Sequence, residues 1–152
     1  MSLAVSEIYA QVVSHAKRLG IFNQVLTHEP KAAPGDGLTC SIWLASLNPI
    51  AEVSGLAATS LRLELSIRIY ENFKSQPEDE IDKRLLDATS KLMEAYTGDF
   101  QLGGTVMDVD LLGAHGDPLG AEGGYLSQDS SLFRVVVMTL PIIISDVYTQ
   151  TA

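Results

Sequence analysis

The sequence contains little of the chemistry from which most metal and disulfide sites are built. Its 152 residues include one cysteine, Cys40, and three histidines, His15, His28 and His115. A lone cysteine cannot form an intrachain disulfide, so folding in the cytoplasm is the default expectation. The histidines show no paired spacing such as H-E-x-x-H. We therefore expect no metal site and no bound cofactor.

Long hydrophobic runs are missing as well. The longest apolar stretch, LFRVVVMTLPIII, contains Arg134 and Pro141, and it is shorter than the roughly 18 residues that cross a bilayer. The N-terminus carries Glu7 and no basic segment ahead of an apolar core, so it does not resemble a signal peptide. These absences predict a protein without a membrane partner. The hydrophobic content of 46% nevertheless predicts a chain that folds around a core.

Positive charge is scarce and unevenly placed. The formal net charge is −9, and no lysine or arginine lies between Lys91 and Arg134. An acidic surface repels phosphate groups, which excludes tight binding of nucleic acid. The simplest interpretation is a solvated face that keeps the protein in solution. The acidic residues of this base-free segment are Glu94, Asp99, Asp108, Asp110, Asp117, Glu122 and Asp129.

Two segments have the periodicity of amphipathic helices. Residues 3–19 place apolar side chains three and four positions apart, and Gly20 follows as a stop signal. A second helix is predicted from Glu78 to Tyr96, with acidic residues in its first turn and Gly98 beyond its end. The side chains expected to be buried are Val5, Ile8, Val12, Ala16 and Leu19 in the first helix and Ile81, Leu85, Ala88, Leu92 and Tyr96 in the second.

Strands are predicted at 22–29, 38–47, 59–71, 105–112 and 132–140. The segment TSLRLELSIRIYE alternates strictly, with Leu61, Leu63, Leu65, Ile67 and Ile69 on one face. In TVMDVDLL the same alternation places Met107, Val109 and Leu111 inward and Asp108 and Asp110 outward.

The connections between these elements complete the predicted architecture. A turn is expected at 31–37 and a loop or irregular edge at 48–57, and Pro141 is expected at a sheet edge or bulge. The order is α-β-β-β-α-β-β, and no linker or repeat divides it. We predict one α+β domain over residues 1–152, with two main helices and a largely antiparallel or mixed sheet.

No arrangement of residues marks a catalytic or ion-binding site. The G-x-S-x-G elbow and the phosphate-binding glycine motifs are absent. Asp108, Asp110 and Gly113 match positions 1, 3 and 6 of a calcium-binding EF-hand loop, but Leu112 and Leu119 stand at positions 5 and 12. We therefore expect a protein that is not an enzyme.

The segment 113–124 and the end of the chain are candidates for contact with a partner. A loop of about a dozen residues without structure of its own is usually functional or disordered. Apolar side chains in and beside segment 113–124 would be stabilised by burial away from water, and so would the three consecutive isoleucines after Pro141. A partner subunit could bury both sets, for example by adding a strand; the isoleucines could equally pack into the chain's own core. The candidate contact residues are Gly113, Asp117, Pro118, Leu119, Tyr125, Ile142, Ile143 and Ile144.

The order and spacing of several short motifs give the chain a resemblance to a known family. An N-terminal helix and an extended segment precede P-G-D-G and LTCSIWLASLNPI, and an alternating strand ends in I-R-I-Y (67–70). A helix closes with A-Y-T-G-D-F (95–100), and D-L-L-G (110–113) leads through the glycine-rich loop to FRVVVMTLPI (133–142). Over nearly its whole length the chain resembles the tail terminator, or tail-completion, proteins of tailed bacteriophages, in the group related to the minor tail protein U of siphophages.

The resemblance implies a virion structural protein at the head-proximal end of the tail, assembled in the host cytoplasm. Such proteins form a homo-oligomeric, hexameric ring that caps the tail tube, stops its growth and joins it to a head-completion or neck protein. DNA passes through the centre without specific binding. On this interpretation, segment 113–124 would be an arm that is mobile in the free subunit, and Asp108, Asp110 and Asp117 would face the DNA channel.

Two other functions remain open at this point. The chain could be another head–tail connector or a tail or baseplate structural protein, which its binding partners would reveal. It could also be a small cytoplasmic ligand-binding protein or enzyme that uses segment 103–126 as a lid.

Overall fold

The computed structural model describes residues 3–30, 37–51, 53–72 and 78–151. Of the turn predicted at 31–37, only Gly37 lies within these ranges. The two predicted helices and a mixed sheet are present, which confirms the α+β class. The elements are α1 (Val5–Arg18), β1 (Gln24–Leu26), β2 (Thr39–Ile50), β3 (Ala58–Asn72), α2 (Glu78–Gly98), the 3-10 turn η1 (Leu102–Gly104), β4 (Asp108–Val109), β5 (Gly120–Gln128) and β6 (Ser131–Thr149).

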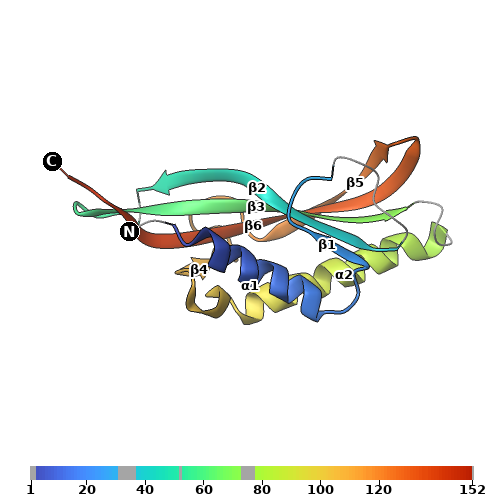
Figure 1. The fold of residues 1–152 in the computed structure, drawn as a ribbon, viewed down its shortest axis with the longest axis horizontal. Coiled ribbons are helices and arrows are strands. Elements are labelled where there is room, and N and C mark those ends of the chain that lie inside the picture. The colour runs from blue at the N-terminus through green and yellow to red at the C-terminus, as the bar shows by residue number, and fades with distance from the viewer. Residues whose placement is uncertain (1–2, 31–36, 52, 73–77, 152) are drawn as a thin grey trace.

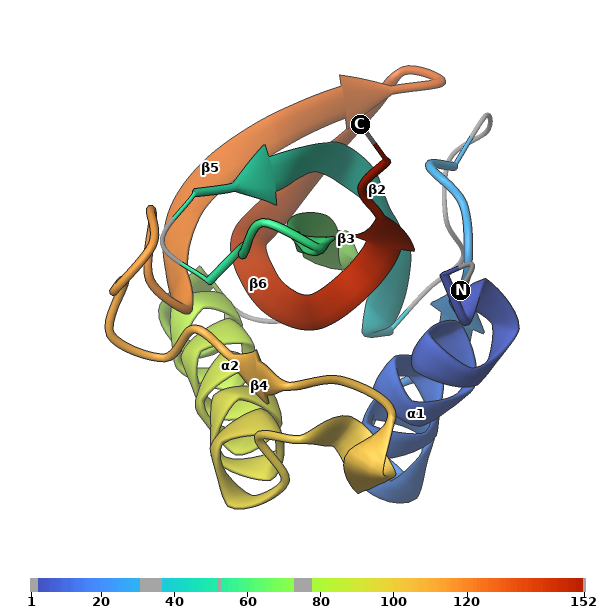
Figure 2. The same cartoon turned by 90° about the vertical axis from the view of Figure 1, so that its left-hand side faces the viewer.

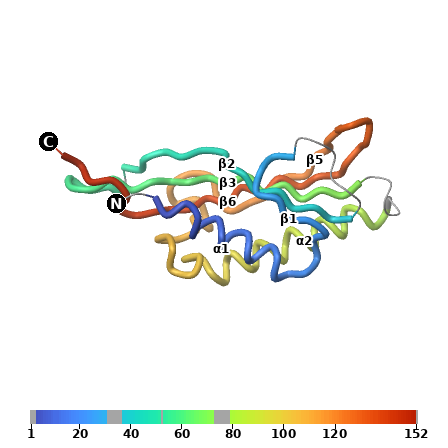
Figure 3. The backbone as a smooth tube through the Cα atoms, viewed as in Figure 1, coloured from blue at the N-terminus to red at the C-terminus, as the bar shows by residue number. Residues whose placement is uncertain are grey.

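The sheet is long and strongly curled. Its strands follow the order β1-β2-β3-β6, and β6 then pairs along its other edge with β5 in its first half and with β4 in its second half. Among the strand pairs that the structure describes, only β1–β2 is parallel. Both helices lie along the same side of the sheet (Figure 1), and the view along the sheet shows how far the strands coil (Figure 2). The backbone trace shows the β5–β6 hairpin rising away from the helices at one end (Figure 3).

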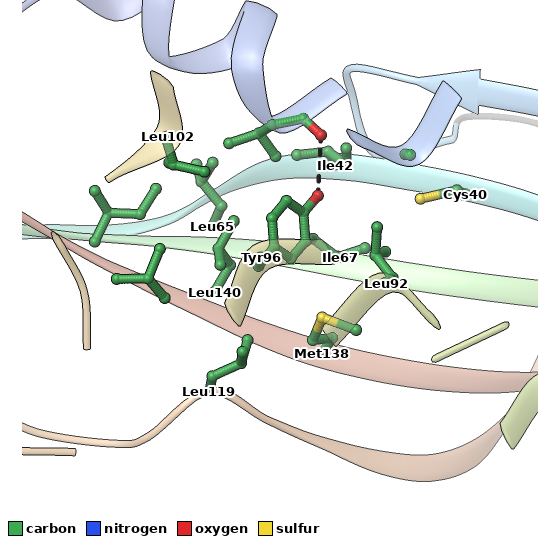
Figure 4. Packing of buried hydrophobic residues seen from close by; sticks show 14 of the residues in the cluster. Cys40, Ile42, Leu65, Ile67, Leu92, Tyr96, Leu102, Leu119, Met138 and Leu140 are labelled. Carbon is green, nitrogen blue, oxygen red and sulfur yellow. Dashed lines mark hydrogen bonds between the residues drawn. The ribbon is translucent and has the colours of Figure 1, made fainter. Parts of the chain in front are cut away.

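The core forms where the predicted apolar stripes meet. All five alternating residues of β3, from Leu61 to Ile69, are buried, as are Ile8, Val12 and Ala16 of α1. The predicted stripe of α2 is buried completely, and the Tyr96 hydroxyl donates a hydrogen bond to the Val12 carbonyl oxygen at 3.0 Å (Figure 4). Val5, by contrast, is half exposed because it starts the first turn of α1. The helical periodicities therefore predicted the packed faces correctly.

Two strands run further than predicted. β2 continues through Pro49 to Ile50, where the sequence indicated a loop, and β1 covers only the first three residues of its other edge. The rest of β2 is an edge, and an edge tolerates proline.

β6 likewise continues through Pro141 to Thr149. The Pro141 carbonyl oxygen accepts from the Asp110 N–H at 2.9 Å. On this side of β6, β5 is the paired strand up to Thr139, and β4 is the paired strand from Ile142 onward. Pro141 lies in the gap between them. The missing proline N–H therefore faces a position without a paired strand, although β6 itself is central.

Part of the glycine-rich segment forms a strand that its sequence pattern does not predict. Residues Gly120–Gln128 make up β5, which pairs with β6 along its full length. The hairpin turn consists of Asp129 and Ser130, with φ of 50° and 64°. Positive φ at both positions is the conformation of a tight two-residue hairpin turn, usually signalled by Asn-Gly or Asp-Gly. The Asp-Ser pair did not give that signal.

Candidate assembly surface

The segment between β4 and β5 is folded around a buried ion pair. Arg62 of β3 donates from Nη1 to Asp110 Oδ2 at 2.5 Å, from Nε to Glu64 Oε1 at 3.1 Å, and from Nη2 to the carbonyl oxygen of Asp117. Only 8% of Arg62 and 5% of Asp110 is exposed. Breaking a buried pair by removing one partner typically costs about 3–5 kcal/mol. Arg62 thus fixes both ends of the segment 110–117.

The backbone of the segment completes the coordination of the Asp110 carboxylate. Oδ1 accepts from the Ala114 N–H at 2.7 Å, and Oδ2 accepts from the His115 N–H at 2.9 Å. Burial alone raises the pKa of Asp110, but the hydrogen bonds from His115, Arg62 and Ala114 outweigh it and lower that pKa overall. Gly116 sits against the guanidinium, where a Cβ would lie 2.8 Å from Arg62 Cζ. The segment therefore has a defined conformation in the single chain.

This geometry corrects four expectations. β4 contains only Asp108–Val109, so the predicted alternation does not extend across 105–112. Asp110 is buried and paired rather than pointing outward, which excludes it as a channel-facing acid, and Met107 is exposed rather than inward. The segment 113–124 is not a loop without structure, because its first part wraps Arg62 and its last part is β5.

Four of the predicted contact residues are buried within their own chain. Leu119 packs in the core beside Met138 and Leu140 (Figure 4), and Ile142, Ile143 and Ile144 are all buried. Of the two possibilities for the isoleucines, packing into the chain's own core is the correct one. These side chains are not available to a partner in this conformation.

Tyr125 is an exposed aromatic member of the predicted set. Its ring lies under the Arg134 guanidinium, whose Cζ is 4.5 Å from the ring centre. Arg134 also donates to Asp82 at 2.8 Å and to the Gly124 carbonyl at 2.8 Å. Asp117 and Pro118 are exposed at the surface of the segment 110–119, and Gly113 is partly covered. The structure leaves these four positions accessible, so their role at an interface stays a prediction.

An extension of the sheet beyond the helices was not predicted from the sequence. We call residues 47–51, 53–59 and 145–151 the distal arm; it extends beyond both helices (Figure 1). Two serines organise it: Ser60 Oγ donates to the Val53 carbonyl and accepts from the Asp146 N–H, while Ser54 Oγ accepts from the Ser60 N–H. Because Ser60 is fully buried, these bonds are shielded from water.

The distal arm and the adjoining edge of β2 present apolar side chains to solvent. Leu56 is fully exposed at the tip, and Leu44, Leu47 and Tyr148 are also exposed. No charged residue occurs in β2. Natural edge strands usually carry charges that prevent pairing with other chains, so an uncharged, leucine-bearing edge favours a contact surface. In the sequence, the run of uncharged residues from Thr39 to Ile50 is the feature that could have predicted this contact surface.

Potential metal ligands and the single cysteine were candidates for chemistry in the sequence. No group of three or more histidine, cysteine, aspartate or glutamate side chains lies close enough to hold a metal ion in the ranges that the structure covers. Cys40 is buried, and burial raises the pKa of its thiol to about 12, so it is not a nucleophile in the folded chain. Within the same ranges, neither helix is long and apolar enough to cross a membrane.

Comparisons with known proteins give a similarity in structure. The sequence matches no family model and no curated protein. The fold is similar to a cryo-EM structure of the PVC sheath/tube terminator, in the extended state, from an extracellular contractile injection system. The TM-score is 0.50 and the sequence identity 14%; the match covers 100% of this chain and 60% of the other, so this chain spans less than two thirds of its length. At this identity the similarity shows that the chain has a terminator-type fold.

Proposed function

We propose that this protein is a terminator of a tail or tube assembly. It would bind the end of the tube as a ring, stop further growth and form the joint to the head or neck. The observation that carries the proposal is the match of the entire chain to the fold of a sheath/tube terminator.

The exposed surfaces of the chain support a role in assembly. The distal arm is held by buried hydrogen bonds yet carries Leu56 and Tyr148 in full or partial contact with water. A projection that is already held by hydrogen bonds within its own chain loses less conformational entropy on binding than a free loop does, so it is suited to docking on another protein. In our proposal the arm contacts the tube protein, and the uncharged edge of β2 lies within the assembly.

The ring is proposed to be a hexamer in the virion, at the head-proximal end of the tail, assembled in the host cytoplasm. DNA would pass through its centre, and acidic side chains would keep the DNA from adhering. With Asp110 excluded, Asp108 and Asp117 remain as channel-facing candidates. Asp108 is half-buried, and burial together with the nearby Asp110 charge raises its pKa.

The first test measures the oligomeric state of the protein by native mass spectrometry over a concentration series. The second test measures its effect on tube growth. The tube protein of the same virus is polymerised with and without this chain, and tube lengths are measured by electron microscopy. A terminator should give shorter tubes with a cap at one end. Another head–tail connector or a baseplate protein should bind its partner without shortening the tubes.

A matched pair of variants tests the distal arm. Leu56→Ser at the arm tip should weaken capping, because it removes a fully exposed apolar side chain from the proposed contact. Leu112→Ser is the control, since Leu112 is also almost fully exposed but lies in the segment between β4 and β5. Unchanged tube lengths with the unmodified chain at every concentration would contradict the proposed function.

A further inference from the structure

Two basic side chains border an exposed groove on the outer side of α1. The groove has a volume of about 600 Å³ and lies between α1 and the segment after β1, with Tyr9, Val13 and Thr27 among its lining residues. Lys17 and Arg18 flank it and are exposed. Neither makes an ion pair with any residue that the structure describes, although Arg18 lies near enough to Asp99 for its charge to help lower the pKa of that carboxyl. The groove thus combines an apolar lining with two exposed cations.

Two acidic side chains border another groove at the start of β5. Asp117 and Glu122 line a depression of about 440 Å³ together with Pro118 and Val137. Glu122 also lines a second depression of about 280 Å³ on the other side of β5, where Leu86 of α2 is exposed. Across the described ranges, neither acid forms an ion pair. Asp117 and Glu122 give this surface the opposite charge to Lys17 and Arg18 beside α1, while Arg134, which also lines the second depression, is paired with Asp82.

The two surfaces lie on opposite sides of the molecule. Viewed along the sheet, α1 is on one side, and α2, the start of β5 and the segment before it are on the other (Figure 2). Complementary patches on opposite sides of one chain produce head-to-tail contacts between copies. Such contacts close into a ring when the rotation per subunit fits.

We propose that the α1 groove of one copy binds the β5 surface of the next copy, with Lys17 and Arg18 facing Asp117 and Glu122. The occupant is a second copy because that copy brings the matching charges and the apolar side chains Leu86 and Val137. Copies with a formal charge of −9 repel each other, so a stable contact needs locally opposite charges. This inference rests on the proposed ring, and it names the surfaces that would close it.

Charge reversal provides a direct test. The base-reversed variant carries Lys17→Glu and Arg18→Glu, and the acid-reversed variant carries Asp117→Lys and Glu122→Lys. Each variant alone presents like charges across the contact, so its assembly should be weakened at least about tenfold. In a 1:1 mixture every alternating contact is again between opposite charges. Native mass spectrometry should then detect rings with equal numbers of the two variants, which their masses distinguish.

Two controls separate charge effects from other effects. The first control, Lys83→Glu with Lys91→Glu, changes the net charge by the same amount as the base-reversed variant but at exposed positions of α2. The protein concentration at which half of its rings dissociate should lie closer to that of the unmodified chain. Urea unfolding of each variant checks that the fold is retained. The substituted side chains of the two reversed variants are all exposed.

The outcomes distinguish this contact from the proposed function. Rings that form equally well from either reversed variant alone would overturn the contact and leave the terminator proposal intact. A mixture that assembles no better than its components would overturn it as well. If the unmodified chain stays monomeric at every concentration, a copy-to-copy contact of this kind is wrong, and tube shortening then decides the function separately.

Discussion

Replacing Arg62 by methionine should destabilise the protein far more than a surface charge deletion. The guanidinium donates to Asp110, to Glu64 and to the Asp117 carbonyl, and 8% of the residue is exposed. Methionine occupies a similar volume, so the change removes the charge and its hydrogen bonds while creating little cavity. The Asp110 carboxylate would stay behind, buried and without its cation.

The size of the effect follows from what remains around Asp110. Breaking a buried pair by removing one partner costs about 3–5 kcal/mol. Asp110 would keep the N–H groups of Ala114 and His115, so we expect the lower end, about 3 kcal/mol in the free energy of unfolding. With a urea dependence of about 2 kcal/mol per molar, the unfolding midpoint should fall by roughly 1.5 M.

The pH dependence gives an independent check on the same pair. The pKa of Asp110 is lowered in the folded chain relative to the unfolded value of 3.8. Its contribution is therefore fully present above that pH and is lost as the pH falls through the folded pKa. The stability difference between the unmodified chain and Asp110→Asn should be constant from about pH 5 to 8 and shrink below about 3.8.

The control for the Arg62 variant is Lys91→Met. The Lys91–Asp87 pair is also within hydrogen-bond distance, at 2.8 Å, but both side chains are exposed, and such pairs contribute about 0.5 kcal/mol or less. Urea unfolding at pH 7 measures both variants, and hydrogen exchange at the Ala114 and His115 amides reports on the segment itself. A cost below about 1 kcal/mol for Arg62→Met, with exchange unchanged, would show that the ion pair does not hold the segment in place.

Three further outcomes follow from the structure. Gly116→Ala should expel Arg62 from its position, because a Cβ would lie 2.8 Å from Cζ and φ is 151°; its unfolding midpoint in urea should approach that of Arg62→Met. Tyr96→Phe should cost about 1 kcal/mol, because the buried bond to Val12 is lost, as measured by urea unfolding. Cys40 should react with a thiol reagent at pH 8 only at the rate of unfolding, because its pKa is about 12 and the side chain is buried; fast modification of the folded chain would contradict this.

The sequence predicted those elements whose pattern directly reflects burial. The period-3.6 stripes of α1 and α2 and the strict alternation of β3 each mark one face against the core, and the corresponding side chains are buried. β5 escaped prediction because glycines at 120, 123 and 124 give no alternation and its turn lacks glycine. Its strand conformation depends on pairing with β6, a tertiary effect that outweighs local propensity.

The ion pair between Arg62 and Asp110 was not predictable for a different reason. The two residues are 48 positions apart, and each fits the polar face of an apparently regular strand. Only the short length of β4 and the turn after it bring the Asp110 carboxylate back over β3. Long-range pairing of this kind leaves no local periodicity in the sequence.

The acidic, base-free segment therefore has more than one role. Asp110 is neutralised by Arg62, and Asp99 accepts from His15 at 2.8 Å and from the Gly103 N–H at 3.0 Å. Asp117 is proposed both as a channel-facing acid and as a partner of the α1 groove, and one carboxylate cannot serve both positions in the same ring. If the mixture of reversed variants restores assembly, Asp117 belongs to the subunit contact. Of the three acids first assigned to the channel, Asp108 would then be left to repel DNA.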